Sequence, residues 1–513
     1  MLFRCLLLTF FLTFVFTLPR PIMAYDNGDL LNAFDKEITS SKAYDALDFL
    51  DELDEDLNHA EKDADPELLD ELGQEYKKEP DSRKIDLFKM LGRNLGGIFR
   101  IRGQHFWQGP DRSQNPNVET ESDFAEGLLE LSTWTGTKRW RLSMSGWLEA
   151  GTHKHTWAGH SEWFQDRDRR RRYLELNEIY LRWYQEEYDL TIGKKVFKNG
   201  ITPLYSPADR YSPKDYNDPL DTKELGIWQV QADYYYKNIV MTGAILPVYQ
   251  ASKNPHEDSR WIGSSADFKF PGLPFRVEED IPRVAFSNIS YFGRVKATAW
   301  GWDLFASAYH GLNPFYVLKV ENEDAIVDDL IDPAMFQAMG VTKDVVKVGN
   351  IAMGFSTTYN KWEFHGEGLY NYSYRSKDDN YLNYVGGITY NIDDMAKKIF
   401  MEQIEITVDY AGEWLMKKQS ARGYVSSSEY SRFGRNDLIG RVNMKVNEDL
   451  SFQVTSVFQV GEEGRYTQCE GKYMLREGLF LIVGVEEFNG PNDSYFGRWD
   501  KNDRVIGALK YSF

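Results

Sequence analysis

The sequence predicts an all-β protein: a transmembrane, antiparallel, up-and-down β-barrel of about 18 strands, preceded by a short acidic N-terminal extension. Three observations predict this fold. From Leu95 onward apolar and polar residues alternate with the period of a strand. Short and long connections follow one another in turn, as in outer-membrane barrels. The last alternating segment ends at Phe513, and a terminal aromatic strand is typical of barrels inserted into the bacterial outer membrane.

The first 24 residues have the pattern of a secretory signal peptide. Arg4 supplies the positive charge, Leu6 to Leu18 is almost wholly apolar, and Ile22-Met23-Ala24 forms a cleavage site before Tyr25. The alternative is an uncleaved anchor helix, for which the apolar run is short. We therefore expect a protein exported across the inner membrane.

Residues 25–90 are predicted to form an acidic, partly helical or disordered periplasmic segment. Asp26 to Lys84 contains 20 acidic and 7 basic residues, which accounts for most of the chain's net charge of −19. Such a high charge with a thin apolar stripe does not favour a packed core. The segment is either a solvated spacer or a tether that binds periplasmic export components.

Residues 95–513 carry the predicted barrel. The segment from Tyr173 to Gln185 illustrates the alternation, because its apolar residues share one face and its polar residues the other. The expected strands are Gly97–Phe106, Phe124–Thr135, Arg139–Ala150, Tyr173–Gln185, Tyr188–Phe197, Gly226–Tyr236, Ile239–Val248, Ala285–Trp300, Trp302–Gly311, Val346–Tyr359, Trp362–Tyr374, Tyr381–Asn391, Gln403–Leu415, Asp437–Val446, Leu450–Val460, Tyr466–Leu475, Gly478–Phe488 and Arg504–Phe513.

The connections predict which end of the barrel faces which compartment. After the even-numbered strands most connections have only a few residues, for example Gly136-Thr137-Lys138 and Asn360-Lys361, whereas most others are long. Short turns belong on the periplasmic side and long loops outside. Trp300, Trp302 and Trp362 flank the short turns, where an interfacial aromatic girdle is expected. We therefore expect Tyr205–Asp218 to be accessible at the cell surface.

The face opposite the lipid should line water, because a charged side chain facing lipid is costly. The alternation places charged residues on this lumen face, and in the functional interpretation they form a path for an anionic solute or polymer. In the structural interpretation, opposite charges pair across strands and fix the register. The residues proposed to line the path are Arg100, Arg102, Arg139, Arg141, Glu178, Arg182, Lys195, Arg294, Lys296 and Arg441.

The stretch LNEIYLRW, the following DLTIGKK and the loop YSPADRYSPKDYNDPLD resemble bacterial outer-membrane barrels of the alginate-export type. The resemblance is clearest over Tyr173 to Tyr235, and elsewhere it depends on the barrel layout. It implies an 18-stranded barrel whose basic lumen conducts a polyuronate and whose loops close the pore. The acidic extension and the sequence of this loop depart from the exporters. Only the GKK motif and Arg182 are carried over.

Other candidate sites have weaker support. His153, His155, His160 and Glu162 lie close together in one outer loop and suit a transition metal, but solvated histidines are commoner, so no metal or other cofactor is predicted. His160-Ser161 alone does not make a catalytic triad. The arginine run at Arg167 and 169–172 suits lipopolysaccharide phosphates or an exposed rim. No nucleic-acid motif is present.

One long outer connection contains a complete short-helix pattern. In the segment from Asp332 to Gly340, Asp332 can cap the helix, Pro333 suits its first turn and Gly340 its end. Its apolar residues Met335 and Phe336 need a surface to pack on. The helix is therefore predicted either to narrow the pore mouth or to stiffen the rim.

The sequence thus predicts a pore of the bacterial outer membrane, not an enzyme, surrounded by lipid and lipopolysaccharide. The favoured cargo is an anionic polysaccharide or a similar solute. The alternatives are a general diffusion porin for the uptake of small anionic solutes and, with less support, a hydrolase embedded in the barrel. No nucleic-acid partner is expected.

Overall fold

The computed structural model describes residues 94–513 except 111–116, 163, 169, 257, 263–276, 321–325, 328–329, 332–340, 430–431 and 492–493. The predicted signal peptide, the predicted acidic segment and the short helix predicted at Asp332–Gly340 therefore lie outside the described residues. Among the described residues, no helix has the length and apolar character needed to cross a membrane.

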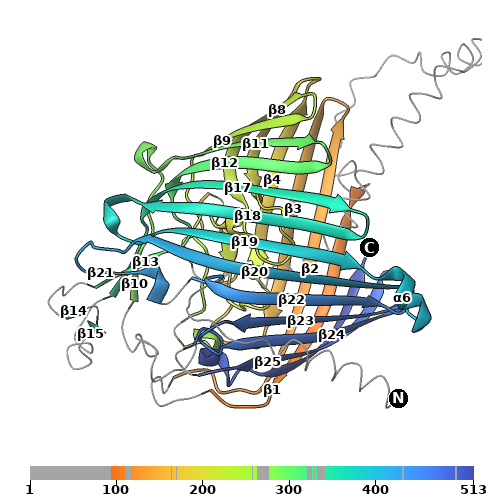
Figure 1. Ribbon diagram of the computed structural model, residues 1–513. Helices are drawn as coiled ribbons and strands as arrows, with labels where there is room; N and C mark the ends of the chain where they lie inside the picture. The colour runs from red at the N-terminus through yellow and green to blue at the C-terminus, as the bar shows by residue number, and fades with distance from the viewer. Residues whose placement is uncertain are drawn as a thin grey trace, which may run out of the picture.

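Eighteen antiparallel strands form one closed barrel (Figure 1). Each strand pairs with its neighbours in chain order, and β1 pairs with β26 to close the barrel, with Ile98 opposite Ser512 and Phe106 opposite Arg504. The strands are β1 (Gly96–Phe106), β2 (Asp123–Thr137), β3 (Trp140–Gly151), β4 (Leu174–Tyr184), β5 (Tyr188–Lys195), β8 (Ile227–Tyr236), β9 (Ile239–Leu246), β11 (Ser290–Ala299), β12 (Trp302–Leu312), β17 (Lys347–Tyr359), β18 (Trp362–Ser373), β19 (Asn380–Asn391), β20 (Gln403–Lys417), β22 (Asn436–Lys445), β23 (Leu450–Gln459), β24 (Arg465–Arg476), β25 (Leu479–Asn489) and β26 (Arg504–Ser512).

The predicted fold and strand order are confirmed, and most strand boundaries lie within a few residues of those expected. The largest difference is at β11, which begins at Ser290 rather than at Ala285. The short helix η5 (Phe286–Asn288) occupies the residues before it. Hydrogen bonds of this helical turn, such as Asn288 N–H to the Ala285 carbonyl, replace the expected strand pairing.

The outer surface of the barrel is apolar, and this follows directly from the alternation. In β9, Met241 and Ile245 are exposed, whereas Thr242 and Ala244 between them are buried. The same pattern around the barrel exposes an apolar band that includes Phe99, Ile101, Leu181, Ile192, Val230, Val295, Ile351, Val408, Val483 and Leu509. A closed barrel has no unpaired edge, and its apolar exterior suits hydrocarbon. The protein therefore lies in the bacterial outer membrane.

The two ends of the barrel differ, as Figure 1 shows. Short turns, the helix α6 (Asp393–Lys398) and the ends of β1 and β26 lie at one end. Exposed aromatic residues gather near these turns, namely Trp183, Trp300, Trp302, Tyr359, Trp362, Tyr511 and Phe513. This is the predicted girdle, and by the sidedness of such barrels it marks the periplasmic end.

The long connections lie at the other end and carry small elements of their own. A four-stranded sheet joins β10 (Val277–Asp280), β16 (Val341–Asp344), β13 (Val317–Val320) and β21 (Tyr424–Val425). A second small sheet pairs β14 (Ile326–Val327) with β15 (Leu330–Ile331), and a third pairs β6 (Lys214–Asp215) with β7 (Lys223–Glu224). The third sheet belongs to the loop that enters the barrel.

Candidate functional site

The loop between β5 and β8, residues 196–226, folds into the barrel instead of projecting from it. Almost every residue from Thr202 to Thr222 is buried, including the short helix η3 (Pro207–Asp209). We call this segment the inward loop. The expectation that Tyr205–Asp218 is accessible at the cell surface is therefore wrong, because the loop finds hydrogen-bond and ion-pair partners on the inner wall.

One side of the inward loop is held by a single carboxylate on the wall. Glu367, on β18, accepts hydrogen bonds from the Thr202 N–H at 2.8 Å and the Ser206 hydroxyl at 2.7 Å. It also accepts the N–H groups of Ile201 and Ala208. One buried side chain therefore satisfies several backbone donors that would otherwise be unpaired where the loop turns.

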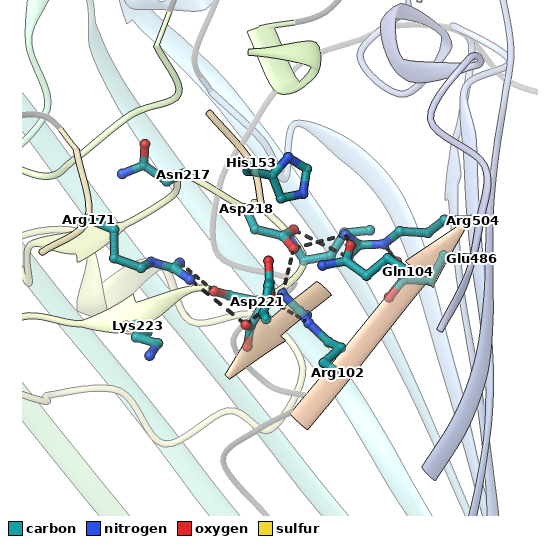
Figure 2. A network of polar contacts seen from close by, with 12 residues as sticks. Arg102, Gln104, His153, Arg171, Asn217, Asp218, Asp221, Lys223, Glu486 and Arg504 are labelled. Carbon is teal, nitrogen blue, oxygen red and sulfur yellow. Dashed lines mark hydrogen bonds and ion pairs between the residues drawn. The ribbon is translucent and has the colours of Figure 1, made fainter. Parts of the chain in front are cut away.

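The other side of the inward loop is held by arginines on β1 and β26 (Figure 2). Asp221 lies 2.6 Å from the Arg100 guanidinium and 3.0 Å from that of Arg102. Asp218 lies 3.2 Å from Arg102 and 2.9 Å from Arg504. These residues are largely buried, so the charges compensate one another where water cannot.

The pKa values of the two aspartates show how strong this compensation is. Burial alone would raise the pKa of Asp218, but the Arg504 and Arg102 charges outweigh it and lower the pKa to about 2. Burial opposes ionisation of Asp221 as well, and the Arg100, Arg102 and Arg171 charges hold its pKa well below its ordinary value. Both carboxylates are therefore ionised at neutral pH.

A second set of ion pairs continues the network toward β3. Glu149, which is buried, lies 2.8 Å from the Lys223 ammonium and 3.5 Å from Arg171, and Asp215 lies 3.2 Å from Arg171. Arg171 is almost fully buried among these partners. The neighbouring Arg172 donates a hydrogen bond to the Asp166 carboxylate. These two members of the arginine run cannot act as an exposed rim or bind lipopolysaccharide.

An apolar core, which we call the plug, packs in the outer half of the lumen. Four loops contribute to it: Tyr205 from the inward loop, Trp261 from the β9–β11 loop, Phe433 from the β20–β22 loop, and Phe496 and Trp499 from the β25–β26 loop. These rings pack in edge-to-face and tilted pairs with centroids about 5–6 Å apart, such as Tyr205 with Phe433 at 5.6 Å. Buried wall residues such as Ile439, Val457 and Tyr466 complete the plug.

Toward the periplasmic turns the lumen is more open. On β11, Phe292 is buried, whereas Arg294 and Lys296 below it are partly exposed. On β23, Val457 is fully buried and Gln453 is partly exposed. Inward-facing positions thus change from packed to solvent-accessible along the strands, so this end forms a vestibule.

The predicted path residues divide into three groups. Arg100 and Arg102 face the lumen, but their charges are paired with the inward loop. Five residues line the wall from β3 to β11 and form what we call the cation ladder: Arg141, Arg182, Lys195, Arg294 and Lys296. The third group consists of Arg139, Glu178 and Arg441, which do not belong to the ladder.

The cation ladder rises from the periplasmic turns to the start of the inward loop. Arg141 lies next to the β2–β3 turn, Arg294 and Lys296 lie farther along β11, and Lys195 ends β5. Arg182 pairs with Asp189 at 2.6 Å and with the Tyr235 hydroxyl at 3.2 Å.

The other four members of the ladder have no carboxylate partner among the described residues. Arg141 lies over the Trp134 ring at 4.6 Å and Lys195 over Tyr180 at 5.2 Å. Arg294 and Lys296 form no hydrogen bond or ion pair within the part of the chain that the structure describes, and the Arg294 Nε is buried without a partner. Their charges are available to the lumen.

The remaining predicted residues are placed differently. Arg139 lies in the exposed two-residue turn between β2 and β3, so it does not line the lumen as expected; the turn is shorter than the sequence pattern indicated. Glu178 faces the lumen, but it accepts hydrogen bonds from the Ser145 hydroxyl at 3.1 Å and the Val196 N–H at 2.8 Å. Arg441 is buried in the wall of β22.

Sequence reasoning missed the inward loop and the plug. A signal was present, because Asp215, Asp218 and Asp221 recur every third residue in a loop that is also rich in proline and tyrosine. Inward arginines on β1 had no acidic neighbour on the adjacent last strand. The two facts together could have indicated that the loop supplies the missing carboxylates.

Comparisons with known proteins find remote matches among solved structures. No protein-family model matches the chain, and no curated protein matches it either. Among solved structures it is similar to a mutant of the Rhodopseudomonas blastica porin, at 10% identity over 82% of this chain and 99% of that one, with a TM-score of 0.33. It is also similar to OccK8 (OprE) of Pseudomonas aeruginosa, at 9% identity over 82% and 98%, with a TM-score of 0.42.

Proposed function

We propose that this barrel is a non-enzymatic pore that passes anionic solutes across the outer membrane along the cation ladder. The observation that carries the proposal is that Arg141, Lys195, Arg294 and Lys296 face the lumen without a carboxylate partner among the described residues. Basic side chains in a confined channel raise the local concentration of anions, as in other anion-selective pores. The paired arginines of β1 have a different task, which is to hold the inward loop.

An exported anionic polysaccharide is the favoured cargo. The resemblance to the alginate exporters over Tyr173–Tyr235 supports it. The position of the ladder supports it as well, because the open vestibule and Arg141 lie at the periplasmic end, where an exported polymer arrives. Lys195 and Arg141 each lie against an aromatic face, so the wall offers positive charge beside flat apolar surface along the path.

Uptake of small anionic solutes is the second candidate. The plug favours it, because aromatic side chains from four loops pack together in the outer half of the lumen. A narrow passage suits small molecules better than a hydrated polymer. The hydrolase receives no support: Ser161 lies within 3.5 Å of the Leu176 N–H, and no histidine contacts its hydroxyl among the described residues.

A matched pair of variants in planar bilayers tests the proposal. Arg294→Gln/Lys296→Gln removes two charges from the ladder, and Lys138→Gln/Arg139→Gln removes two charges from an exposed periplasmic turn. In a salt gradient, the reversal potential should shift toward cation preference for the ladder variant only. Equal shifts, or no shift in either variant, would reject the ladder as the conducting wall. Block of the current by an oligouronate, in contrast to free passage of small organic anions, separates the two cargoes.

A further inference from the structure

Two histidines and an aspartate from different outer loops meet at the extracellular end of the barrel. His155 belongs to the β3–β4 loop, and His256 and Asp258 belong to the β9–β11 loop. The two imidazole rings are nearly parallel, with centroids 4.9 Å apart and an interplanar angle of 12°. One donor atom from each of the three residues lies within 4.8 Å of the others.

The three side chains have the chemistry of a transition-metal site. Two imidazole nitrogens and one carboxylate oxygen form a ligand set that zinc accepts, with a fourth position left for water. His256 Nδ1 accepts a hydrogen bond from the Asp258 N–H at 3.2 Å, so an ion bound at this nitrogen would replace that hydrogen bond. The Asp258 carboxylate lies 3.8 Å from the same nitrogen.

The geometry requires only a small adjustment. Bonds of about 2.0–2.1 Å in a tetrahedral site place two donor atoms roughly 3.4 Å apart, compared with the present limit of 4.8 Å. Rotation of the side chains can supply that difference. All three residues are partly exposed, so an ion can reach them from outside.

The neighbouring histidines and acidic groups are otherwise engaged. His153 stacks on Phe124, with centroids 3.6 Å apart, and bonds to Glu119 at 2.9 Å. The buried trio Glu126, Glu149 and Asp221 is also close enough to hold an ion, but arginine and lysine side chains already neutralise it. Of the two clusters among the described residues, the buried trio is therefore part of the ion-pair network rather than a metal site.

We propose that His155, His256 and Asp258 bind a divalent transition-metal ion, with zinc as the reference ion, and that the ion joins the two loops. Asp258 lies two residues before Arg260, which donates hydrogen bonds to the carbonyls of Gln108 at 2.9 Å and Glu121 at 3.0 Å. Trp261, the next residue, is part of the plug. A bound ion therefore fixes the loop that carries one of the aromatic rings of the plug.

Titration calorimetry with zinc alone on the refolded full-length barrel tests the proposal. The expected result is one ion per barrel, with affinity reduced at least tenfold in His155→Ala and in His256→Ala. His160→Ala, which removes an exposed histidine of the same loop, serves as the matched control and should bind like the wild type. Circular dichroism and heat-modifiable migration in gels verify that each variant is folded.

A second readout uses copper in place of zinc. The electron paramagnetic resonance spectrum should show coupling to two imidazole nitrogens in the wild type and in His160→Ala, and to one in His155→Ala. Absence of binding by the wild-type barrel, or equal binding by the His155, His256 and His160 variants, would overturn the proposal. Because neither measurement involves conduction, the result does not depend on the function proposed for the lumen.

Discussion

Breaking the ionic anchor of the inward loop should release that loop from the wall of β1. Asp221→Asn keeps the size of the side chain but removes its charge, and the Asp221 carboxylate is the shortest ion-pair contact of Arg100, at 2.6 Å. Removing one partner of a buried pair costs about 3–5 kcal/mol, because the other charge is left uncompensated. Because 1.4 kcal/mol corresponds to a tenfold change in an equilibrium constant, the state in which the loop is detached from β1 should become more populated by a factor on the order of 10²–10³.

Thiol labelling measures this release. Thr222, next to Asp221 in the chain, is buried, and a cysteine at this position should be protected from a membrane-impermeant reagent in the parent barrel. Asp221→Asn should raise its labelling rate by about the factor by which the detached state increases. Asp123→Asn is the matched control, because the Asp123 side chain is 83% exposed and pairs, among the described residues, with the rim residue His105.

An unchanged labelling rate in Asp221→Asn would refute the reasoning that the β1 arginines anchor the loop. Rapid labelling of the parent barrel would refute the inward position of the loop itself. The single-channel record offers an independent readout, because release of the loop also leaves Arg100 and Arg102 facing the lumen with fewer partners. Anion preference should then rise in the variant.

Three other predictions follow from the same structure. The pKa of the Asp218 carboxyl is lowered to about 2 from 3.8, so the stabilisation that this carboxylate provides is complete above about pH 4 and declines as the pH falls toward 2. Melting curves across this pH range should show the decline, and the decline should disappear in Asp218→Asn. A cysteine at Asn360 should react with an impermeant reagent only after the outer membrane is permeabilised, and labelling of intact cells would contradict the sidedness. In Gly387→Ala the new Cβ would lie 1.9 Å from Asp409 Oδ1 and would separate the Asp409 carboxylate from the His365 ring, whose hydrogen-bonding atoms are now 2.7 Å apart. Leaving this buried pair unsatisfied should destabilise the barrel by about 1–3 kcal/mol. An unchanged melting temperature would show that the pair does not contribute to stability.

The barrel could be predicted from the sequence because its determinants are local. Alternation within each strand places residues such as Met241 and Thr242 on opposite faces, and the short turns fix the pairing of neighbours. Lumen-facing positions such as Arg102 and Arg294 could therefore be named correctly. The alternation does not predict which residue pairs with a charged side chain that faces the lumen.

The partners depend on contacts between distant segments. Asp221 meets Arg100 across more than a hundred residues, and Glu367 meets the inward loop from β18. Whether a loop folds inward depends on the sum of such ion pairs, backbone hydrogen bonds and ring contacts. The hydrophobic periodicity of the sequence carries no information about these long-range contacts. For this reason the sequence pattern treated Arg102 and Arg294 alike, although one anchors a loop and the other faces the lumen without a partner.

One-sided block by a polyanion shows whether anions enter the barrel along the cation ladder. Poly-glutamate is added to either side of a bilayer that contains oriented channels, with the orientation set by labelling a cysteine at Asn360. The cation ladder begins at the periplasmic vestibule and the plug packs in the outer half of the lumen, so addition on the side of the short turns should block the current at low concentration. Addition on the outer side should have little effect. Equal block from both sides, or no block from either, would contradict the account.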